Sequence, residues 1–192
     1  MGLSLSDTQT QQLLDYLALM MKWNKTYNLS AIRSTDEGIK KHLLDSLSVL
    51  EHIGQGRLLD VGAGAGLPGV VISIMRPDLS VTVLDSVGKK CRFMQFVKTQ
   101  LQLDNLQVVN DRVEQYQPQQ CFEQITSRAF ASIEKTLKLT QHLLCDNGSY
   151  LLMKGDHFED ELIEGVRIEA QQISVPYVSD QRFLLSIRVE NS

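Results

Sequence analysis

Three glycines, Gly62, Gly64 and Gly66, alternate with alanines directly after an apolar run at residues 57–61. Pro68 follows them, and proline is common in the first turn of a helix. Glycine lets a ligand approach the main chain closely, and a helix N-terminus presents unpaired N–H groups. Because ligands of open α/β sheets bind beyond the carboxyl ends of the strands, this pattern predicts a ligand site directly after the run at 57–61.

Two ligand classes fit this loop. Gly64, Gly66 and Gly69, followed by Asp85 about 20 residues on, satisfy the dinucleotide-binding fingerprint. Asp60, however, would repel a pyrophosphate and suits the ammonium and sulfonium groups of S-adenosylmethionine. The chain is also short for a second, dehydrogenase-type substrate domain, and no later segment supplies an obvious acid or base for hydride transfer. We therefore expect an S-adenosylmethionine-dependent methyltransferase rather than a dinucleotide enzyme.

Polar residues stand where the next strands end. Asp85 can accept both ribose hydroxyls of an adenosyl group, or cap the helix that follows. Val113 offers a backbone N–H beside the adenine, and Glu114 a polar neighbour. Arg128, after the fourth strand, can hold the donor carboxylate or a substrate phosphate, or form a plain surface salt bridge.

Two missing motifs narrow the reaction. No Asp/Asn-Pro-Pro-Tyr stretch follows the fourth strand, which argues against methylation of an exocyclic amine. No Pro-Cys pair lies there either, so cysteine-assisted methylation of carbon is not expected. Ring nitrogens, hydroxyls and carboxylates remain as acceptors.

The elements that position these residues fall into two parts. Capping boxes at 6–9 and 34–37 each begin an amphipathic helix, the first ending near Asn28. After a break at 54–56, strands alternate with helices, which predicts a parallel sheet with right-handed crossovers. The expected strands are 57–61, 81–84, 106–110, 122–126 and 150–154, and the expected helices are 70–75, 89–101 and 133–145.

The C-terminal segments 167–175 and 182–189 are both β-rich, and only six residues separate them. Such a link is too short for a parallel crossover, so the two segments should pair antiparallel. The sequence thus predicts an N-terminal helical extension over residues 1–54, covering the pocket, and a Rossmann-like core over residues 55–192.

Composition sets broader limits. With 43% hydrophobic and 22% charged residues the chain is ordinary for a globular protein. No apolar run is long enough to span a bilayer, and the N-terminus does not resemble a secretory signal, so we expect a cytoplasmic protein. Cys91, Cys121 and Cys145 lack close spacing and are predicted to be reduced core residues. The net charge of −4 argues mildly against nucleic acid, but residues 86–103 are basic without any acid, so either a basic patch or an ordinary solvated helix face is possible.

The sequence resembles the RsmG family (glucose-inhibited division protein B), the bacterial guanine-N7 methyltransferases of small-subunit ribosomal RNA. The order and spacing of several stretches carry the resemblance: 22–30 (KWNKTYNLS), 42–47 (HLLDSL), 60–69 (DVGAGAGLPG), 84–86 (LDS), 127–130 (SRAF) and 153–155 (MKG). Ser30 departs slightly from a more frequent threonine. The resemblance implies a class I methyltransferase fold, with seven strands, one of them antiparallel.

The resemblance also implies roles for individual residues. Cofactor contacts are expected from the glycine loop and the strand ends, namely Gly62, Gly64, Gly66, Leu67, Asp85, Val113, Glu114 and Arg128. Arg128 and Lys154 are expected to position phosphate or the donor carboxylate, without a general base and without a metal. Two pairs at helical spacing, Asn24 with Asn28 and His42 with Asp45, are expected to position the target base, although His42 bonded to Asp45 is equally a packing fixture.

The implied function is methyl transfer from S-adenosylmethionine to N7 of a guanine in 16S rRNA, in the 530 loop of the decoding region. The expected partner is the small ribosomal subunit, its rRNA or an assembly intermediate, bound by a monomer that contacts neither membrane nor DNA. Two alternatives remain open, a small-molecule methyltransferase of the same fold and a non-catalytic ribosome-assembly factor.

Overall fold

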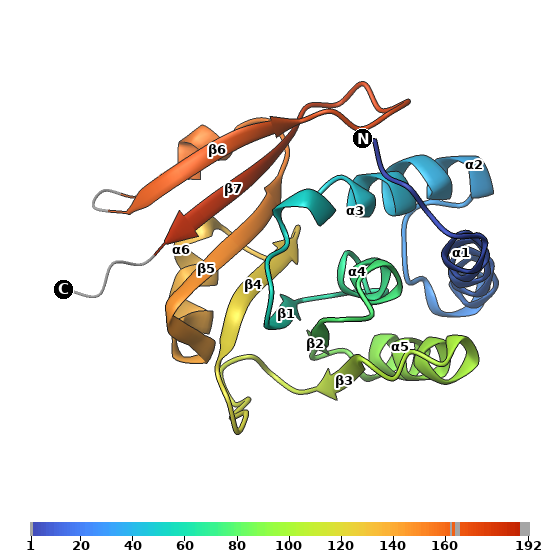
Figure 1. Cartoon of the computed structure of the whole chain (residues 1–192), viewed down its shortest axis with the longest axis horizontal. Coiled ribbons are helices and arrows are strands. Elements are labelled where there is room, and N and C mark those ends of the chain that lie inside the picture. The colour runs from blue at the N-terminus through green and yellow to red at the C-terminus, as the bar shows by residue number, and fades with distance from the viewer. Residues whose placement is uncertain (1, 162, 164–165, 189–192) are drawn as a thin grey trace.

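A single twisted sheet forms the centre of the computed structural model, which describes residues 2–161, 163 and 166–188. Within these residues seven strands lie in the order β3-β2-β1-β4-β5-β7-β6 (Figure 1). Neighbours among β1 to β5 are parallel, and β7 is antiparallel to both β5 and β6. This confirms the expected sheet with one antiparallel strand. The strands are β1 (Arg57–Val61), β2 (Ser80–Asp85), β3 (Leu106–Asn110), β4 (Phe122–Arg128), β5 (Leu144–Lys154), β6 (Arg167–Ile173) and β7 (Arg182–Arg188).

The strand order reverses between β1 and β4, which are neighbours in the sheet although β2 and β3 lie between them in sequence. The chain runs outward from β1 to β3 and then returns to the other side of β1. At such a switch point the connections leave in opposite directions, and a crevice opens at the carboxyl ends of the strands. The glycine loop begins at this point, as the sequence predicts.

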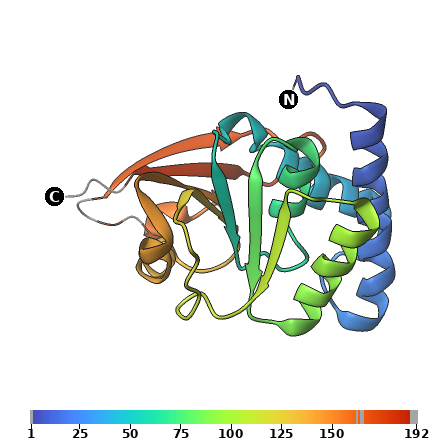
Figure 2. The same cartoon turned by 60° about the horizontal axis from the view of Figure 1, so that its bottom comes forward.

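Helices cover both faces of the sheet (Figures 1 and 2). α1 (Asp7–Tyr27), α4 (Gly69–Met75) and α5 (Gly88–Leu101) enclose the larger hydrophobic cluster, and α6 (Ile133–Thr140) packs on the opposite cluster. No helix of the described residues is long and apolar enough to cross a membrane. The shorter helical turns are α2 (Thr35–Gly38), η1 (Ile39–Leu44), α3 (Asp45–Leu47), η2 (Leu50–His52), η3 (Gln141–Leu143) and η4 (Phe158–Glu161).

The N-terminal helices begin where the capping signals predict. Ser6 forms a full capping box with Gln9, and α1 ends at Tyr27, followed by the C-cap Asn28, whose φ of 50° is left-handed. Ser34 accepts a hydrogen bond from the Glu37 N–H. The second segment is not one helix, however, but a run of short α, π and 3-10 turns, with six residues of π-helix in η1.

The expected helix over residues 133–145 is too long. α6 ends at Thr140, a 3-10 turn follows, and β5 already begins at Leu144. Apolar residues at 133, 137 and 144 keep a helical spacing across this boundary, so hydrophobic periodicity alone does not mark it. Pairing of β5 with β4 and β7 determines where the strand begins.

The prediction of three reduced core cysteines is wrong for two of them. Cys121 and Cys145 form a disulfide with Cα atoms 5.0 Å apart, whereas Cys91 is buried and free, as expected. Cys121 directly precedes β4 and Cys145 lies near the start of β5. Phe122 pairs with Leu144 in the parallel register, so residues 24 apart in sequence become neighbours.

The first helix supports the glycine loop from behind. Tyr16 of α1 is fully buried, and its hydroxyl donates a hydrogen bond of 2.8 Å to the Ala65 carbonyl oxygen. The N-terminal extension and the glycine loop are therefore joined by a direct polar contact across the core.

We predict that Tyr16→Phe lowers the free energy of unfolding by roughly 1–3 kcal/mol, because the Ala65 carbonyl loses its buried donor. The variant should also bind the loop's ligand more weakly. Tyr150→Phe is the matched control, since it removes a buried hydroxyl bonded to Thr140 on the opposite side of the sheet. Chemical denaturation and calorimetric titration measure both effects; equal ligand affinity in the two variants would contradict the supporting role.

Candidate active site

Left-handed backbone shapes the glycine loop. Gly62, Gly64 and Gly66 have φ values of +67°, +62° and +97°. A Cβ at Gly62 would lie 2.3 Å from Cδ2 of Phe130, and one at Gly66 would lie 2.4 Å from Cγ2 of Val70. Two of these positions therefore require glycine for both conformation and space.

Hydrogen bonds from the end of β2 hold the loop in place. The N–H groups of Gly62 and Ala63 donate to the Leu84 carbonyl oxygen at 2.8 and 3.1 Å. The Gly64 N–H donates to Oδ2 of Asp85 at 2.9 Å. The loop and the second strand end thus form one rigid unit.

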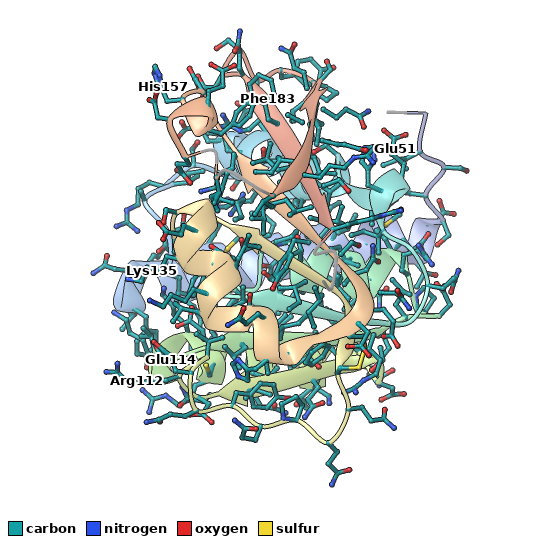
Figure 3. The ribbon with its side chains drawn as sticks, turned by 90° about the vertical axis from the view of Figure 1, so that its left-hand side faces the viewer. Glu51, Arg112, Glu114, Lys135, His157 and Phe183 are labelled. Carbon is teal, nitrogen blue, oxygen red and sulfur yellow. A yellow bond between two sulfur atoms is a disulfide. The ribbon has the colours of Figure 1, made fainter. Side chains whose placement is uncertain are left out.

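A first cavity of about 360 Å³ opens beside this loop. It brings together four of the predicted cofactor residues, Gly62, Asp85, Val113 and Glu114, whereas Gly64, Gly66, Leu67 and Arg128 are not among its lining residues. Figure 3 shows Arg112 and Glu114, which follow β3, on the same side of the molecule as Lys135 of α6. The lining residues are Gly62, Leu84, Asp85, Ser86, Val87, Lys90, Asp111, Arg112, Val113, Glu114, Ala129, Phe130, Ala131, Lys135 and Leu139.

Asp85 is the buried carboxylate of the first cavity. Its Oδ1 accepts a hydrogen bond from the Val87 N–H at 2.8 Å, and Lys90 Nζ lies 3.6 Å from its Oδ2. Asp85 is not the N-cap of α5, because that position belongs to Val87. A carboxylate offers about four acceptor sites, so lone pairs remain for ribose hydroxyls.

A second carboxylate lies beneath the loop. Asp60 is fully buried; its Oδ2 accepts the Gly69 N–H at 2.7 Å, and its Oδ1 has no hydrogen-bond partner among the described residues. Burial raises the pKa of Asp60 to about 7. Asp60 thus leaves one carboxylate oxygen unbonded under the loop, and Asp85 and Glu114 lie beside the cavity. This concentration of carboxyl groups would attract a cationic sulfonium ligand and repel a pyrophosphate.

A second cavity, also of about 360 Å³, adjoins the first. Ala129, which has a φ of +53°, lines both of them at the carboxyl end of β4. A group passed from a ligand in one cavity to a ligand in the other would cross here. The second cavity is lined by Lys41, His42, Asp45, Arg128, Ala129, Met153, Lys154, Gly155 and Arg182.

Asp45 organises the cations of the second cavity. Its Oδ2 accepts a 2.9 Å bond from Arg128, and its Oδ1 accepts one of 3.1 Å from Nε of Arg182. Arg128 also donates to the Lys41 carbonyl oxygen at 2.9 Å. One buried carboxylate thus serves two guanidiniums. Arg182 also lies 3.4 Å from the exposed Asp180, whereas Arg128 has no second carboxylate partner among the described residues.

His42 and Lys154 are both held in place on the same wall. His42 Nε2 is 2.8 Å from Ser30 Oγ, and no hydrogen bond joins His42 to Asp45. Burial, and the nearby Arg128 guanidinium, lower the pKa of His42 to about 4, so the ring is neutral at pH 7. Lys154 donates to the Ala131 carbonyl oxygen at 2.8 Å and pairs with Glu161 at 2.6 Å.

The two predicted asparagines shape the loop that follows α1. Asn24 donates to the Ile32 carbonyl oxygen and accepts the Ser30 N–H, both at 2.8 Å. Asn28 accepts a 3.0 Å bond from Arg33. Neither asparagine lines the two cavities. Asn24 reaches His42 through Ser30, and Asn28 is joined to Asn24 through Arg33. A part for the two asparagines in positioning the base remains a prediction.

Sequence reasoning missed Arg182, Phe130 as the ring over Gly62, and the Tyr16 contact. Arg182 lies 137 residues from Asp45, and no local pattern connects them. Tyr16 falls on the apolar stripe of α1, where its hydroxyl is the only signal of a polar contact.

The solved structures that match this fold include methyltransferases. One from Aquifex aeolicus matches with a TM-score of 0.60 and 17% identity, covering 80% of this chain and 93% of that one. The N-methyltransferase NodS from Bradyrhizobium japonicum, in complex with S-adenosyl-l-homocysteine, matches with a TM-score of 0.56 and 14% identity over 96% of this chain and all of its own. The fold is thus that of the class I methyltransferases, and S-adenosylmethionine is the cofactor that the residues of the first cavity fit.

The sequence comparisons identify the family. The GidB model, described as rRNA small subunit methyltransferase G, matches residues 9–182, and the chain belongs to this family. A relative named ribosomal RNA small subunit methyltransferase G, from Ruthia magnifica subsp. Calyptogena magnifica, is 60% identical over 99% of this chain and 93% of its own length. Another of that name, from Methylobacillus flagellatus, is 50% identical over 96% of this chain and 91% of its own.

The raised pKa of Asp60 predicts a pH dependence of stability. The folded protein binds a proton at the Asp60 carboxyl more tightly than the unfolded chain does. The stabilisation that this protonation gives the folded state is complete below the unfolded pKa of 3.8 and is lost as the pH rises to about 7. We expect the free energy of unfolding of the cofactor-free protein, relative to Asp60→Asn, to fall between about pH 5 and pH 7, by at most about 1.4 kcal/mol per unit. Urea titrations measure the difference. Asp78→Asn, which removes a carboxylate from an exposed ion pair, is the control. If the difference in free energy of unfolding between wild type and Asp60→Asn stays level or rises with pH, the raised pKa of Asp60 is wrong.

Proposed function

We propose that this methyltransferase acts on N7 of a guanine in 16S rRNA, in the 530 loop of the decoding region, within the small ribosomal subunit or an assembly intermediate. The family and its relatives support ribosomal RNA as the substrate class. The proposal includes a monomeric cytoplasmic protein that contacts neither membrane nor DNA.

The lack of a free general base in the second cavity supports guanine N7 as the methyl acceptor. The second cavity contains cations and a neutral histidine, but its two candidate bases are engaged: Asp45 is bonded to two arginines, and His42 to Ser30. Guanine N7 has an in-plane lone pair and no proton, so its methylation needs alignment and no general base. A hydroxyl acceptor would require a base that these residues do not offer.

Bound S-adenosylmethionine supplies an electrophilic methyl group. The chain's own residues orient the two reactants. Asp85 would accept the ribose hydroxyls, and Val113 and Glu114 would border the adenine, while Gly62, Gly64, Gly66 and Leu67 set the loop. Excess positive charge beside the product's cationic ring would be unfavourable, so we assign the cations to phosphates or to the donor carboxylate.

The cations of the second cavity fit an acceptor that carries phosphate. Arg128 and Lys154 would position the substrate backbone, and Asp45 would hold Arg128 in place. Residues 1–54 would cover the site, because Lys41, His42 and Asp45 all come from this extension. Asn24 and Asn28 would act through the loop that carries Ser30. A small-molecule acceptor remains the second candidate, and the assay below distinguishes it.

The test is transfer of labelled methyl to small ribosomal subunits from cells that lack this gene, followed by borohydride–aniline cleavage, which cuts at N7-methylguanosine. We expect one new cut in the 530 loop. We also expect Arg128→Ala to lower kcat/KM for subunits by about 100-fold through the loss of a phosphate contact, with Kd for S-adenosylmethionine changed less than about threefold.

Arg167→Ala, on the exposed face of β6, is the matched control and should retain full activity. Label without a cut would exclude N7 as the acceptor. Absence of label on subunits and on free rRNA, with the cofactor still bound, would support the small-molecule reading. An Arg128→Ala protein with the wild-type rate would remove Arg128 from the site.

A further inference from the structure

Two long segments of this acidic protein contain no acidic residue. Residues 16–35 and 86–103 together hold seven of the 19 Lys and Arg residues and none of the 23 Asp and Glu residues. The chain has a net charge of −4, so the remainder is strongly acidic. The first cavity uses only Lys90 of these seven. Cofactor binding therefore does not account for the concentration of Lys and Arg residues in these two segments.

The fold brings the two segments side by side. α1 and α5 lie next to each other at one edge of the molecule (Figures 1 and 2). Gln12 near the start of α1 donates to the Leu101 carbonyl oxygen at the end of α5, so the helices run in opposite directions. The ring of Trp23 lies 5.5 Å from that of Phe93, which fixes the basic end of α1 against the first half of α5.

Aromatic rings emerge between the basic side chains. Phe96 is 36% exposed and Tyr27 is 39% exposed, and their rings flank Trp23, whose ring centroid is 5.4 Å from Phe96 and 5.1 Å from Tyr27. On α5, Lys89 and Arg92 precede Phe96 by seven and four residues, which places all three on one side of the helix. We call Lys22, Tyr27, Lys89, Arg92 and Phe96 the α1–α5 face.

The cations of this face lack counter-charges. In the described part of the chain, no carboxylate pairs with Lys22, Lys89 or Arg92, whereas Lys40, Lys41 and several arginines elsewhere are paired. Positive side chains without a carboxylate partner, beside exposed aromatic rings, are the features that bind single-stranded nucleic acid. The cations contact its phosphates and the rings stack against its bases. The surface also continues to the cofactor site, since Ser86 and Val87 line the first cavity just before α5 begins.

We propose that the α1–α5 face is a second RNA-binding surface, outside both cavities, which holds a partly unpaired segment of the rRNA substrate. Lys22, Lys89 and Arg92 bind its phosphates, and Tyr27 and Phe96 stack against its bases. The inference rests on the proposed rRNA substrate. It adds a contact that binds the substrate without touching the reacting atoms.

Charge reversal tests the phosphate contacts. In the full-length enzyme with small subunits as substrate, Lys89→Glu with Arg92→Glu should raise KM at least tenfold and reduce the slope of log KM against log salt by about 1.5. The kcat at saturating subunits and Kd for S-adenosylmethionine should match the wild type, because neither residue touches the cavities. Lys138→Glu is the matched control and should leave KM and slope unchanged, because Lys138 is exposed on α6 and has no ion-pair partner among the residues that the structure describes.

Aromatic substitutions test the stacking contacts. Phe96→Leu should raise KM about fivefold and Phe96→Tyr should restore it, a pattern that loss of packing alone does not give. Tyr177→Ser, at a ring that is 83% exposed in the turn before β7, is the control. Ultraviolet crosslinking of enzyme to subunits should join peptides within residues 16–35 and 86–103 to nucleotides.

The outcomes separate this inference from the proposed function. If the wild type methylates N7 but the variants keep its KM and salt slope, the α1–α5 face does not bind RNA. Crosslinks from these peptides to ribosomal protein instead of nucleotides would also overturn the proposal. If the wild type itself leaves N7 unmodified, the proposed function fails first.

Discussion

The rest of the site depends on one constraint, the left-handed backbone of the glycine loop at the switch point of the sheet. Such a loop is costly to order because glycine has the most conformational freedom to lose. Hydrogen bonds to it from three directions offset that cost: Leu84 and Asp85 at the end of β2, Asp60 at the helix start, and Tyr16 from α1. The loop is therefore rigid before a ligand arrives, and its shape excludes side chains at Gly62 and Gly66.

The N-terminal extension is part of this machinery and not an appendage. Tyr16 supports the loop from one side, and Asp45 reaches Arg128 and Arg182 on the other. A buried carboxylate bonded to two guanidiniums satisfies its own lone pairs and holds the positive charge of both guanidiniums at the second cavity. The extension thereby couples the cofactor loop, the end of β4 and the start of β7. A phosphate-bearing acceptor is the natural complement of that charge.

Much of this architecture could be predicted because its signals are local. The glycine loop, the cap at Ser6 and the alternation of strands and helices all follow from short-range patterns, and the six-residue link between the last two segments predicts their antiparallel pairing. Contacts that depend on register could not be predicted. The Cys121–Cys145 disulfide and the Asp45–Arg182 bond join segments whose proximity is set by strand order. A bond between His42 and Asp45, the structural alternative for that pair, had the right helical spacing, but His42 bonds Ser30 and Asp45 bonds two arginines.

The central claim is that donor and acceptor occupy adjoining cavities that meet at Ala129. A crystal structure with S-adenosylhomocysteine and a guanine nucleotide tests it most directly. We expect ribose on Asp85, adenine beside Val113, and the nucleotide phosphate near Arg128, with sulfur and guanine N7 facing each other across Ala129. An adenosyl group outside the first cavity, or a guanine that approaches from the side of the sheet away from β4, would contradict it.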